Sequence, residues 1–246
     1  NKNVACVVGL SLALASLGAR AADAPQETKK PMGWTGVLSE DQFKALHQLK
    51  EGQTPPHKGR MVTVGGERAY LSLPEGAKPP LPAVIVIHEW WGLNDNIMLW
   101  ADRLAADGYA ALAVDLYHGT VAHDPDHALA AMKAVKPAPT LETLDAAYRF
   151  LAEAPDVRAS RRAVMGWCFG GGWSLQFALH EPGLTAAVMY YGRLVTDPDE
   201  LKPLRAPLLG VFGNRDEGIP PAAVNEFAAA LEKGGKTFSI VRCHAP

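Results

Sequence analysis

Short apolar runs recur along the chain from about residue 60 onward, separated by longer segments of mixed polarity. Five of these runs are almost wholly apolar, which is typical of strands buried on both faces of a parallel sheet. They are residues 83–87, 110–114, 163–165, 186–190 and 208–212. Two further runs, 61–64 and 69–73, flank Gly65-Gly66 and predict a hairpin, and residues 237–241 predict a last strand.

Apolar residues at helical spacing lie between the predicted strands. They predict helices at residues 95–107, 125–135, 140–153, 171–181 and 221–233. Thr140 is placed to cap the third of them. Strand–helix alternation over this length predicts one α/β domain, a three-layer sandwich with a mostly parallel central sheet. In such sheets the chemistry sits on loops at the carboxyl ends of the strands, so these loops hold the candidate residues.

The first 21 residues have the pattern of a cleavable export signal. Lys2 precedes an apolar stretch at 4–17, and Ala19 and Ala21 provide the small residues of a cleavage site. The stretch is shorter than the roughly 20 residues that span a bilayer, although an uncleaved anchor is the alternative. We therefore expect a periplasmic or secreted protein without stable membrane association after cleavage. Residues 22–59, polar and rich in proline, are predicted to be a lead-in and linker.

Composition narrows the range of functions. Hydrophobic residues make up 48% of the 246 residues, as in globular proteins. The 24 Lys and Arg residues are balanced by 26 Asp and Glu residues, so no basic excess points to nucleic acid as a partner. Three cysteines are too few for a disulfide scaffold, which directs attention to their chemistry instead.

The most informative segment is 166–172, with the sequence Gly-Trp-Cys-Phe-Gly-Gly-Gly, between a predicted strand and a predicted helix. It matches the nucleophile elbow of hydrolases, with Cys168 in the place of serine. The glycines allow the turn to pack tightly, and the helix N-terminus is expected to favour the Cys168 thiolate. The backbone N–H of Phe169 is a candidate oxyanion donor. A phosphate-binding loop is excluded because no Lys-Ser/Thr pair follows the glycines.

A nucleophile of this kind needs a base and an acid that orients it. Asp216 follows the predicted strand at 208–212, two strands after the elbow, where the acid belongs in an α/β-hydrolase sheet. Of the eight histidines, only His244 comes after Asp216. It follows the last predicted strand and is the candidate base within the printed sequence.

Four segments together resemble the dienelactone hydrolase family of α/β-hydrolases, in particular its exported bacterial members. They are His88-Glu89-Trp90-Trp91-Gly92, Asp115-Leu116-Tyr117, the elbow at 166–171 and Gly213-Asn214-Arg215-Asp216. The resemblance covers residues 60–246. It implies an α/β-hydrolase fold, with Cys168 as nucleophile, Asp216 as acid and Glu89 as the group that holds the resting thiol and controls its ionisation. It also implies that the Trp90 N–H joins that of Phe169 in the oxyanion hole.

The chain departs from the family pattern at its end. The family's histidine usually closes a Tyr-Asp-Ala-x-His stretch, and Cys243-His244-Ala245-Pro246 fills its first four positions. We therefore expect the domain at 60–246 to be truncated, with the base just beyond Pro246 and His244 as the alternative.

The resulting prediction is a hydrolase of carboxylic esters or lactones that works without metal or organic cofactor. The Cys168 thiolate attacks the acyl carbon, a thioester forms, and water activated by the histidine of a Cys-His-Asp triad releases the acid. The polar residues at 118–127 match no defined metal site. Two alternatives stay open: a thiol/disulfide redox protein that pairs Cys168 with Cys243, and a non-catalytic small-molecule binding protein on the same fold.

Overall fold

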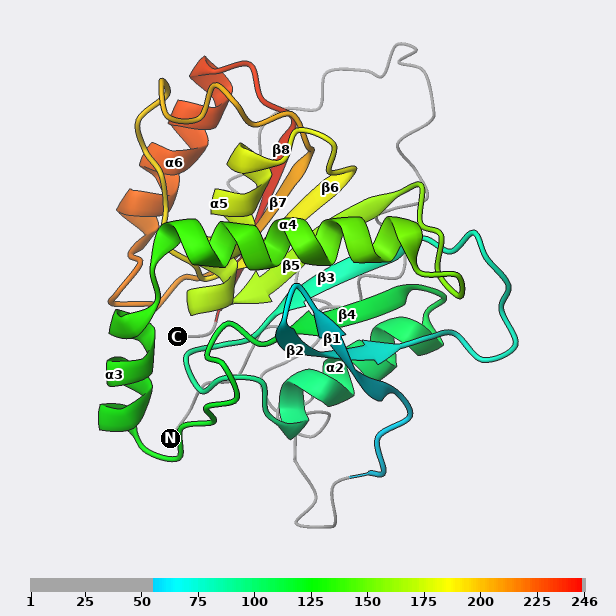
Figure 1. The fold of residues 1–246 in the computed structure, drawn as a ribbon. Helices are drawn as coiled ribbons and strands as arrows, with labels where there is room; N and C mark the ends of the chain where they lie inside the picture. Colours follow the sequence, from blue (N-terminus) through cyan, green and yellow to red (C-terminus); the bar gives the residue numbers. More distant parts are fainter. Residues whose placement is uncertain (1–54, 245–246) are drawn as a thin grey trace, which may run out of the picture. The chain divides into compact units, whose positions relative to one another are not determined.

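The computed structural model describes residues 55–244. Their central element is an eight-stranded sheet with the order β1-β2-β4-β3-β5-β6-β7-β8 (Figure 1). The strands are β1 (Arg60–Val64), β2 (Glu67–Ser72), β3 (Ala83–Ile87), β4 (Ala110–Val114), β5 (Arg162–Trp167), β6 (Ala186–Tyr190), β7 (Leu208–Gly213) and β8 (Phe238–Cys243). The predicted signal peptide at 1–21 and most of the predicted lead-in at 22–59 lie outside the described residues.

Strands β1 and β2 form the predicted antiparallel hairpin, and β2 pairs antiparallel with β4. From β4 to β8 every pairing is parallel. Strand β3 lies between β4 and β5, and all five of its residues are buried, as its apolar run predicts. The carboxyl ends of β3, β5, β6 and β7 therefore meet at one edge of the sheet, where the candidate residues follow them.

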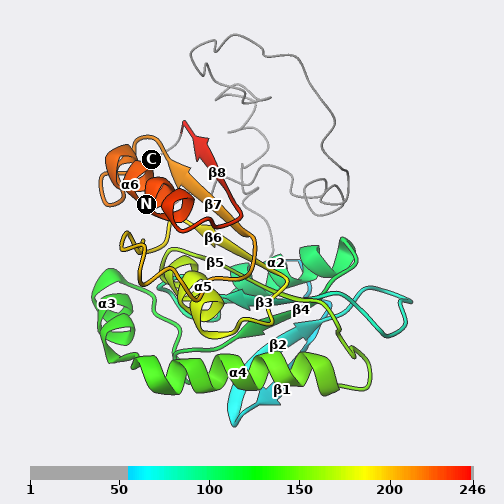
Figure 2. The ribbon, with the colours of Figure 1, turned by 90° about the horizontal axis from the view of Figure 1, so that it is seen from above.

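Helices cover both faces of the sheet (Figures 1 and 2). They are α2 (Asp95–Ala106), α3 (Pro125–Ala134), α4 (Pro137–Glu153), α5 (Phe169–His180) and α6 (Pro221–Lys233). Helices α4, α5 and α6 share one hydrophobic cluster with the sheet, to which Leu144, Leu175 and Phe227 belong. Helix α2 lies on the opposite face (Figure 2), where Trp100 contacts Trp167 of β5 with ring centroids 5.3 Å apart.

Two helix boundaries differ from the predictions. Helix α4 begins at Pro137, three residues before Thr140, so the prediction of Thr140 as its N-cap is wrong. The Thr140 hydroxyl instead donates to the Lys136 carbonyl one turn earlier, 2.8 Å away. Proline is favoured in the first turn of a helix because its missing N–H has no intrahelical partner there. Helix α5 begins at Phe169 rather than residue 171, so Cys168 itself is the residue that precedes the helix.

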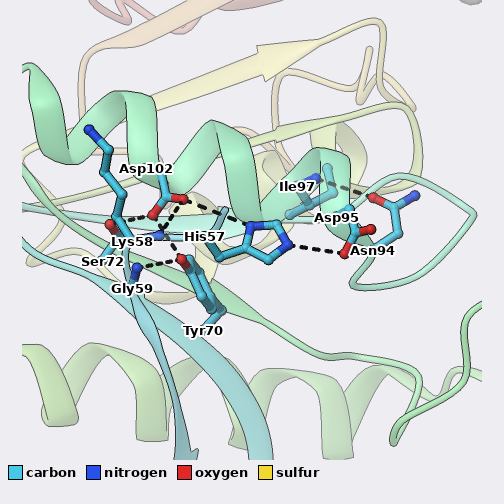
Figure 3. Close-up of polar contacts among 9 residues, drawn as sticks. All are labelled: His57, Lys58, Gly59, Tyr70, Ser72, Asn94, Asp95, Ile97 and Asp102. Atoms are coloured by element: carbon cyan, nitrogen blue, oxygen red, sulfur yellow. Dashed lines mark hydrogen bonds and ion pairs between the residues drawn. The ribbon is translucent and has the colours of Figure 1, made fainter. Parts of the chain in front are cut away.

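A buried carboxylate joins the segment before β1 to the rest of the domain (Figure 3). Asp102 of α2 accepts hydrogen bonds from the hydroxyls of Tyr70 and Ser72 on β2, at 2.8 and 2.7 Å. Its other oxygen accepts from the backbone N–H of Lys58 at 3.1 Å. Burial alone would raise the pKa of Asp102, but the hydrogen bonds from Ser72, Lys58 and Tyr70 hold it below its usual value. The charged carboxylate thus fixes residues 58–59 against α2 and β2.

Candidate active site

Cys168 occupies a sharp turn between β5 and α5. Its backbone has φ 54° and ψ −115°, a left-handed conformation that a residue with a side chain rarely adopts. The turn is held on both sides: the Cys168 N–H donates to the Tyr190 carbonyl at 3.0 Å, and the Cys168 carbonyl accepts from the Gly172 N–H at 3.1 Å. This is the geometry of the predicted nucleophile elbow.

The glycines of the elbow allow three backbone segments to touch. A Cβ on Gly170 would overlap the carbonyl oxygens of Ile87, the last residue of β3, and of His88, which follows it. A Cβ on Gly171 would overlap the Tyr190 carbonyl oxygen at the end of β6. Because backbone carbonyls cannot move aside like side chains, only glycine fits at these two positions. The elbow is therefore pressed between the ends of β3 and β6.

Two backbone N–H groups converge on the sulfur of Cys168. One belongs to Phe169, the first residue of α5, and the other to Trp90 in the loop after β3, and both N–H groups lower the pKa of the thiol. The loop is held by the Ala122 N–H, which donates to the Trp91 carbonyl at 2.9 Å. Gly92, with φ +91°, packs against the Thr120 carbonyl. The two donors predicted for the oxyanion hole are thus brought together beside Cys168.

The side chain of His88 fixes the start of the loop after β3. Its Nε2 accepts the Leu116 N–H at 3.1 Å, so its Nδ1 carries the proton and donates to the Glu89 carbonyl at 2.6 Å. The ring is fully buried, stacks on Phe169 and meets Tyr117 edge-on. Burial lowers the pKa of His88 to about 4, so the imidazole is neutral near pH 7. It is a structural group whose role the sequence did not predict, although His88 belongs to a segment that resembles the family.

The buried neutral state of His88 predicts a dependence of stability on pH. Its pKa is about 4 in the folded chain and 6.5 without burial, so the unfolded chain binds the extra proton and stability falls as pH drops below 6.5. We expect the free energy of unfolding to fall by about 2 kcal/mol more in the wild type than in His88→Gln between pH 7.5 and pH 5. Glutamine keeps one donor and one acceptor without titrating. Urea unfolding at both pH values tests this, and equal losses in the two proteins would contradict it.

Two carboxylates approach Cys168 from neighbouring loops. Glu89 follows β3 and accepts a hydrogen bond from the Tyr191 hydroxyl at 2.8 Å. Burial raises the pKa of Glu89, although this hydrogen bond opposes the shift. Asp216 follows β7, and its Oδ1 accepts the N–H groups of Gly218 and Ile219 at 2.8 and 2.9 Å. The Asp216 carboxylate is therefore oriented by its own loop, as a residue that positions a base must be.

The pKa of the Cys168 thiol is raised in this setting. Burial is the main cause, and the charges of Glu89 and Asp216 add to it. The N–H groups of Phe169 and Trp90 lower the pKa, but they do not compensate. The N–H group at the helix N-terminus thus favours the thiolate, as expected, but desolvation and the two carboxylates outweigh its effect on the pKa of the thiol.

The structure places His244, the candidate base, and shows the state of Cys168, a member of the predicted redox pair. The Nε2 of His244 accepts from the Arg215 guanidinium at 3.0 Å, and a nitrogen engaged in this way cannot also take a proton from a thiol. Whether His244 or a histidine beyond Pro246 serves as base stays a prediction. Cys168 is a free thiol, so the disulfide between Cys168 and Cys243 is not formed.

A cavity of about 560 Å³ lies beside the loop that follows β4. Tyr117 belongs to its wall and also contacts Phe169, with ring centroids 5.3 Å apart. Much of the remaining wall comes from the apolar side chains Leu116, Ala130, Ala131 and Val135. A space of this size with apolar walls suits part of a small organic molecule.

Within residues 55–244, no group of three or more His, Cys, Asp and Glu residues is arranged to hold a metal ion. His118 instead pairs with Glu67 at 2.9 Å, and Asp124 caps α3 through the His127 N–H at 3.0 Å. None of the helices in this part of the chain has the length and apolar character of a membrane span.

Residues 68–245 match the dienelactone hydrolase family, and they include the whole elbow and both carboxylates. The chain belongs to this family. The fold and the family predicted from the sequence are thereby confirmed.

Individual proteins show the extent of the likeness. The "Putative carboxymethylenebutenolidase" of Methylorubrum extorquens is 34% identical over 188 residues, which are 70% of this chain and 64% of that protein. "Protein usf" of Aquifex pyrophilus is 32% identical over 181 residues and is covered over 77% of its length. A crystal structure of a "Putative Dienelactone Hydrolase" from Klebsiella pneumoniae has a TM-score of 0.69 at 32% identity, covering 75% of this chain and 84% of the other. The chain thus spans somewhat less than two thirds of the first of these proteins.

Proposed function

We propose that the chain hydrolyses carboxylic esters or lactones of small molecules through Cys168 as nucleophile. The observation that carries the proposal is the convergence of the Phe169 and Trp90 N–H groups on the sulfur of a strained elbow. Donors that face the nucleophile are placed to bind the negative oxygen that forms on an attacked carbonyl. Membership of the dienelactone hydrolase family supports the same chemistry.

The reaction follows from the arrangement of these groups. The histidine that Asp216 orients takes the proton of the Cys168 thiol, the resulting thiolate attacks the acyl carbon, and the carbonyl oxygen becomes an anion held by the two N–H groups. The carbon–oxygen bond of the ester breaks, and the leaving alkoxide takes a proton from a histidine imidazolium that Asp216 orients. Water then gives a proton to the same histidine and attacks the thioester, which releases the acid and restores Cys168. No metal or organic cofactor enters this scheme.

The thioester is the intermediate that distinguishes this mechanism from others. We expect the full chain, mixed with p-nitrophenyl acetate and quenched in acid, to carry one acetyl group on the peptide that contains Cys168. Mass spectrometry of the digest locates the group, and prior alkylation of Cys168 with iodoacetamide serves as the control that blocks it. Acetyl found only on other residues, or p-nitrophenol released by alkylated protein at the original rate, would contradict the proposal.

We also propose that the protein is exported, with residues 1–21 removed as a signal peptide. The basic Lys2, the apolar stretch at 4–17 and the small residues Ala19 and Ala21 support this. The expected location is the periplasm or the medium, without stable membrane association of the mature chain.

A further inference from the structure

The cavity of about 560 Å³ lies at the same edge of the sheet as Cys168. Its wall begins with Leu116 and Tyr117, which follow β4, and continues with one side of α3 and the start of α4. In the strand order β4-β3-β5, only β3 separates this wall from the elbow (Figure 1). Because neighbouring strands are about 5 Å apart, the wall after β4 lies roughly 10 Å from the elbow. A substrate bound at Cys168 can therefore extend into the cavity.

The side chain of Tyr117 connects the cavity to the elbow. Its ring is buried and contacts Phe169, the first residue of α5, with ring centroids 5.3 Å apart. Burial raises the pKa of the Tyr117 hydroxyl, and the charge of Cys168 raises it further, as expected for two groups that lie close together. A molecule that rests against Tyr117 thus lies beside the residue whose N–H is an oxyanion donor.

The chemistry of the wall selects what the cavity can hold. Among the described residues, no aspartate or glutamate belongs to the wall, and its histidines, His118 and His127, are each paired with a carboxylate outside it. Lys136 is exposed to solvent. The part of the wall that α3 provides includes the aliphatic side chains of Ala131 and Val135. Since burial of an unpaired charge is costly, the cavity suits an uncharged apolar group.

The strand order also decides which part of an ester points toward the cavity. Asp216 follows β7, and the order β4-β3-β5-β6-β7 places it on the opposite side of the elbow from the cavity. The leaving alkoxide must lie within hydrogen-bond reach of the histidine that Asp216 orients, so it points toward β7. The acyl chain is attached to the other side of the attacked carbon. It therefore points toward β4 and the cavity.

We propose that the cavity between the loop after β4, α3 and α4 is an acyl-binding site, and that the preferred substrates are esters with an uncharged, apolar acyl chain of medium length. The inference rests on the proposed function, which supplies the attacked carbonyl and the direction of the leaving group. An acetyl group is too short to reach the cavity, so acetate esters report the reaction without this site.

A series of p-nitrophenyl esters tests the proposal on the full-length protein. We expect kcat/KM to rise roughly fourfold for each CH2 group added from acetate through butyrate to hexanoate, because each group leaves water for the cavity. A carboxylate at the end of the hexanoyl chain should cancel this gain. Ala131→Phe fills the cavity and should lower the ratio of the hexanoate to the acetate kcat/KM at least roughly tenfold. A ratio that is the same in wild type and variant overturns the proposal.

A matched substitution on the same helix serves as the control. Leu129→Phe also adds an aromatic ring to α3, but Leu129 is exposed and lies outside the cavity wall, so the ratio should stay at the wild-type value. Should Ala131→Phe fail to fold, Ala134→Phe places the ring at an exposed position of the wall and must lower the ratio in the same way. A loss of the hexanoate preference in Leu129→Phe as well would overturn the assignment to the cavity.

Binding of hexanamide separates this inference from the proposed function. Hexanamide carries the same acyl group without an ester bond, and calorimetric titration into Cys168→Ala measures its affinity without turnover. Adding Ala131→Phe in this background should weaken binding at least roughly fivefold. Weaker binding in a protein whose wild type hydrolyses no ester would uphold the site while refuting the proposed function. Hydrolysis through Cys168 with equal hexanamide binding in both backgrounds would do the reverse.

Discussion

Replacing Cys168 by alanine is expected to lower kcat/KM for p-nitrophenyl acetate by at least roughly a thousandfold, because no other group at the elbow can form the thioester. The fold should survive, since the elbow conformation depends on backbone contacts with Tyr190 and Gly172. The measurement is the release of p-nitrophenol by wild type and variant at one pH, with the buffer rate subtracted.

Cys168→Ser is the matched control, since it keeps the size and position of the nucleophile but replaces a thiol by a less acidic hydroxyl. We expect it to retain more activity than Cys168→Ala and less than the wild type. Hydrolysis that persists unchanged in Cys168→Ala would show that the nucleophile has been assigned wrongly. A folded wild type that binds esters without turning them over would instead favour the non-catalytic binding protein.

Gly170→Ala is expected to destabilise the protein by about 3 kcal/mol or more, the upper range for overpacking in a core. The added Cβ would overlap the carbonyl oxygens of Ile87 and His88, which belong to the central strand β3 and to the oxyanion loop. Relief requires the elbow or that loop to move. Urea unfolding measures the loss, and the acetylation of Cys168 should weaken in parallel.

Gly172→Ala, one residue beyond Gly171 in the same helix, is the comparison. There a Cβ would meet the Arg193 backbone nitrogen at 3.2 Å, a close contact that a small shift relieves. Alanine also favours the helix by up to about 1 kcal/mol over glycine. We therefore expect a change within about 1 kcal/mol of zero. Equal destabilisation by both substitutions would mean that the contact with β3 is not the cause.

The elements that the sequence predicted best are those in which local pattern and burial agree. The apolar runs at 83–87 and 110–114 became strands with the predicted bounds, because strands buried on both faces must be apolar throughout. The start of α4 differs from the prediction because Pro137 begins the helix, whereas threonine at 140 is only a weak cap signal. The first residue of a helix is hard to locate from the sequence when several possible cap residues or prolines follow one another.

Some residues of the candidate site could be predicted from the sequence and others could not. Cys168, Glu89 and Asp216 were predicted from the sequence, and the structure brings all three to one edge of the sheet. Tyr191 and His88 were not predicted, because their roles depend on partners that are distant in the chain, such as Glu89 for Tyr191. A tyrosine before a glycine at the end of a buried strand was the available signal. The pKa of Cys168 depends mainly on burial, which the sequence does not show, whereas the helix N-terminus that lowers this pKa is visible in the sequence.

The contacts of the elbow have a consequence for how the protein folds. Gly170 packs against the end of β3, and the Cys168 N–H donates a hydrogen bond to the Tyr190 carbonyl at the end of β6. The two strands are about a hundred residues apart in the sequence. Loops between distant segments must close before such contacts form, and closure of this kind slows folding. The site is therefore complete only when β3, the elbow and β6 have all come together. The thiol gains its oxyanion donors and its carboxylate neighbours only then, which limits reactivity to the finished fold.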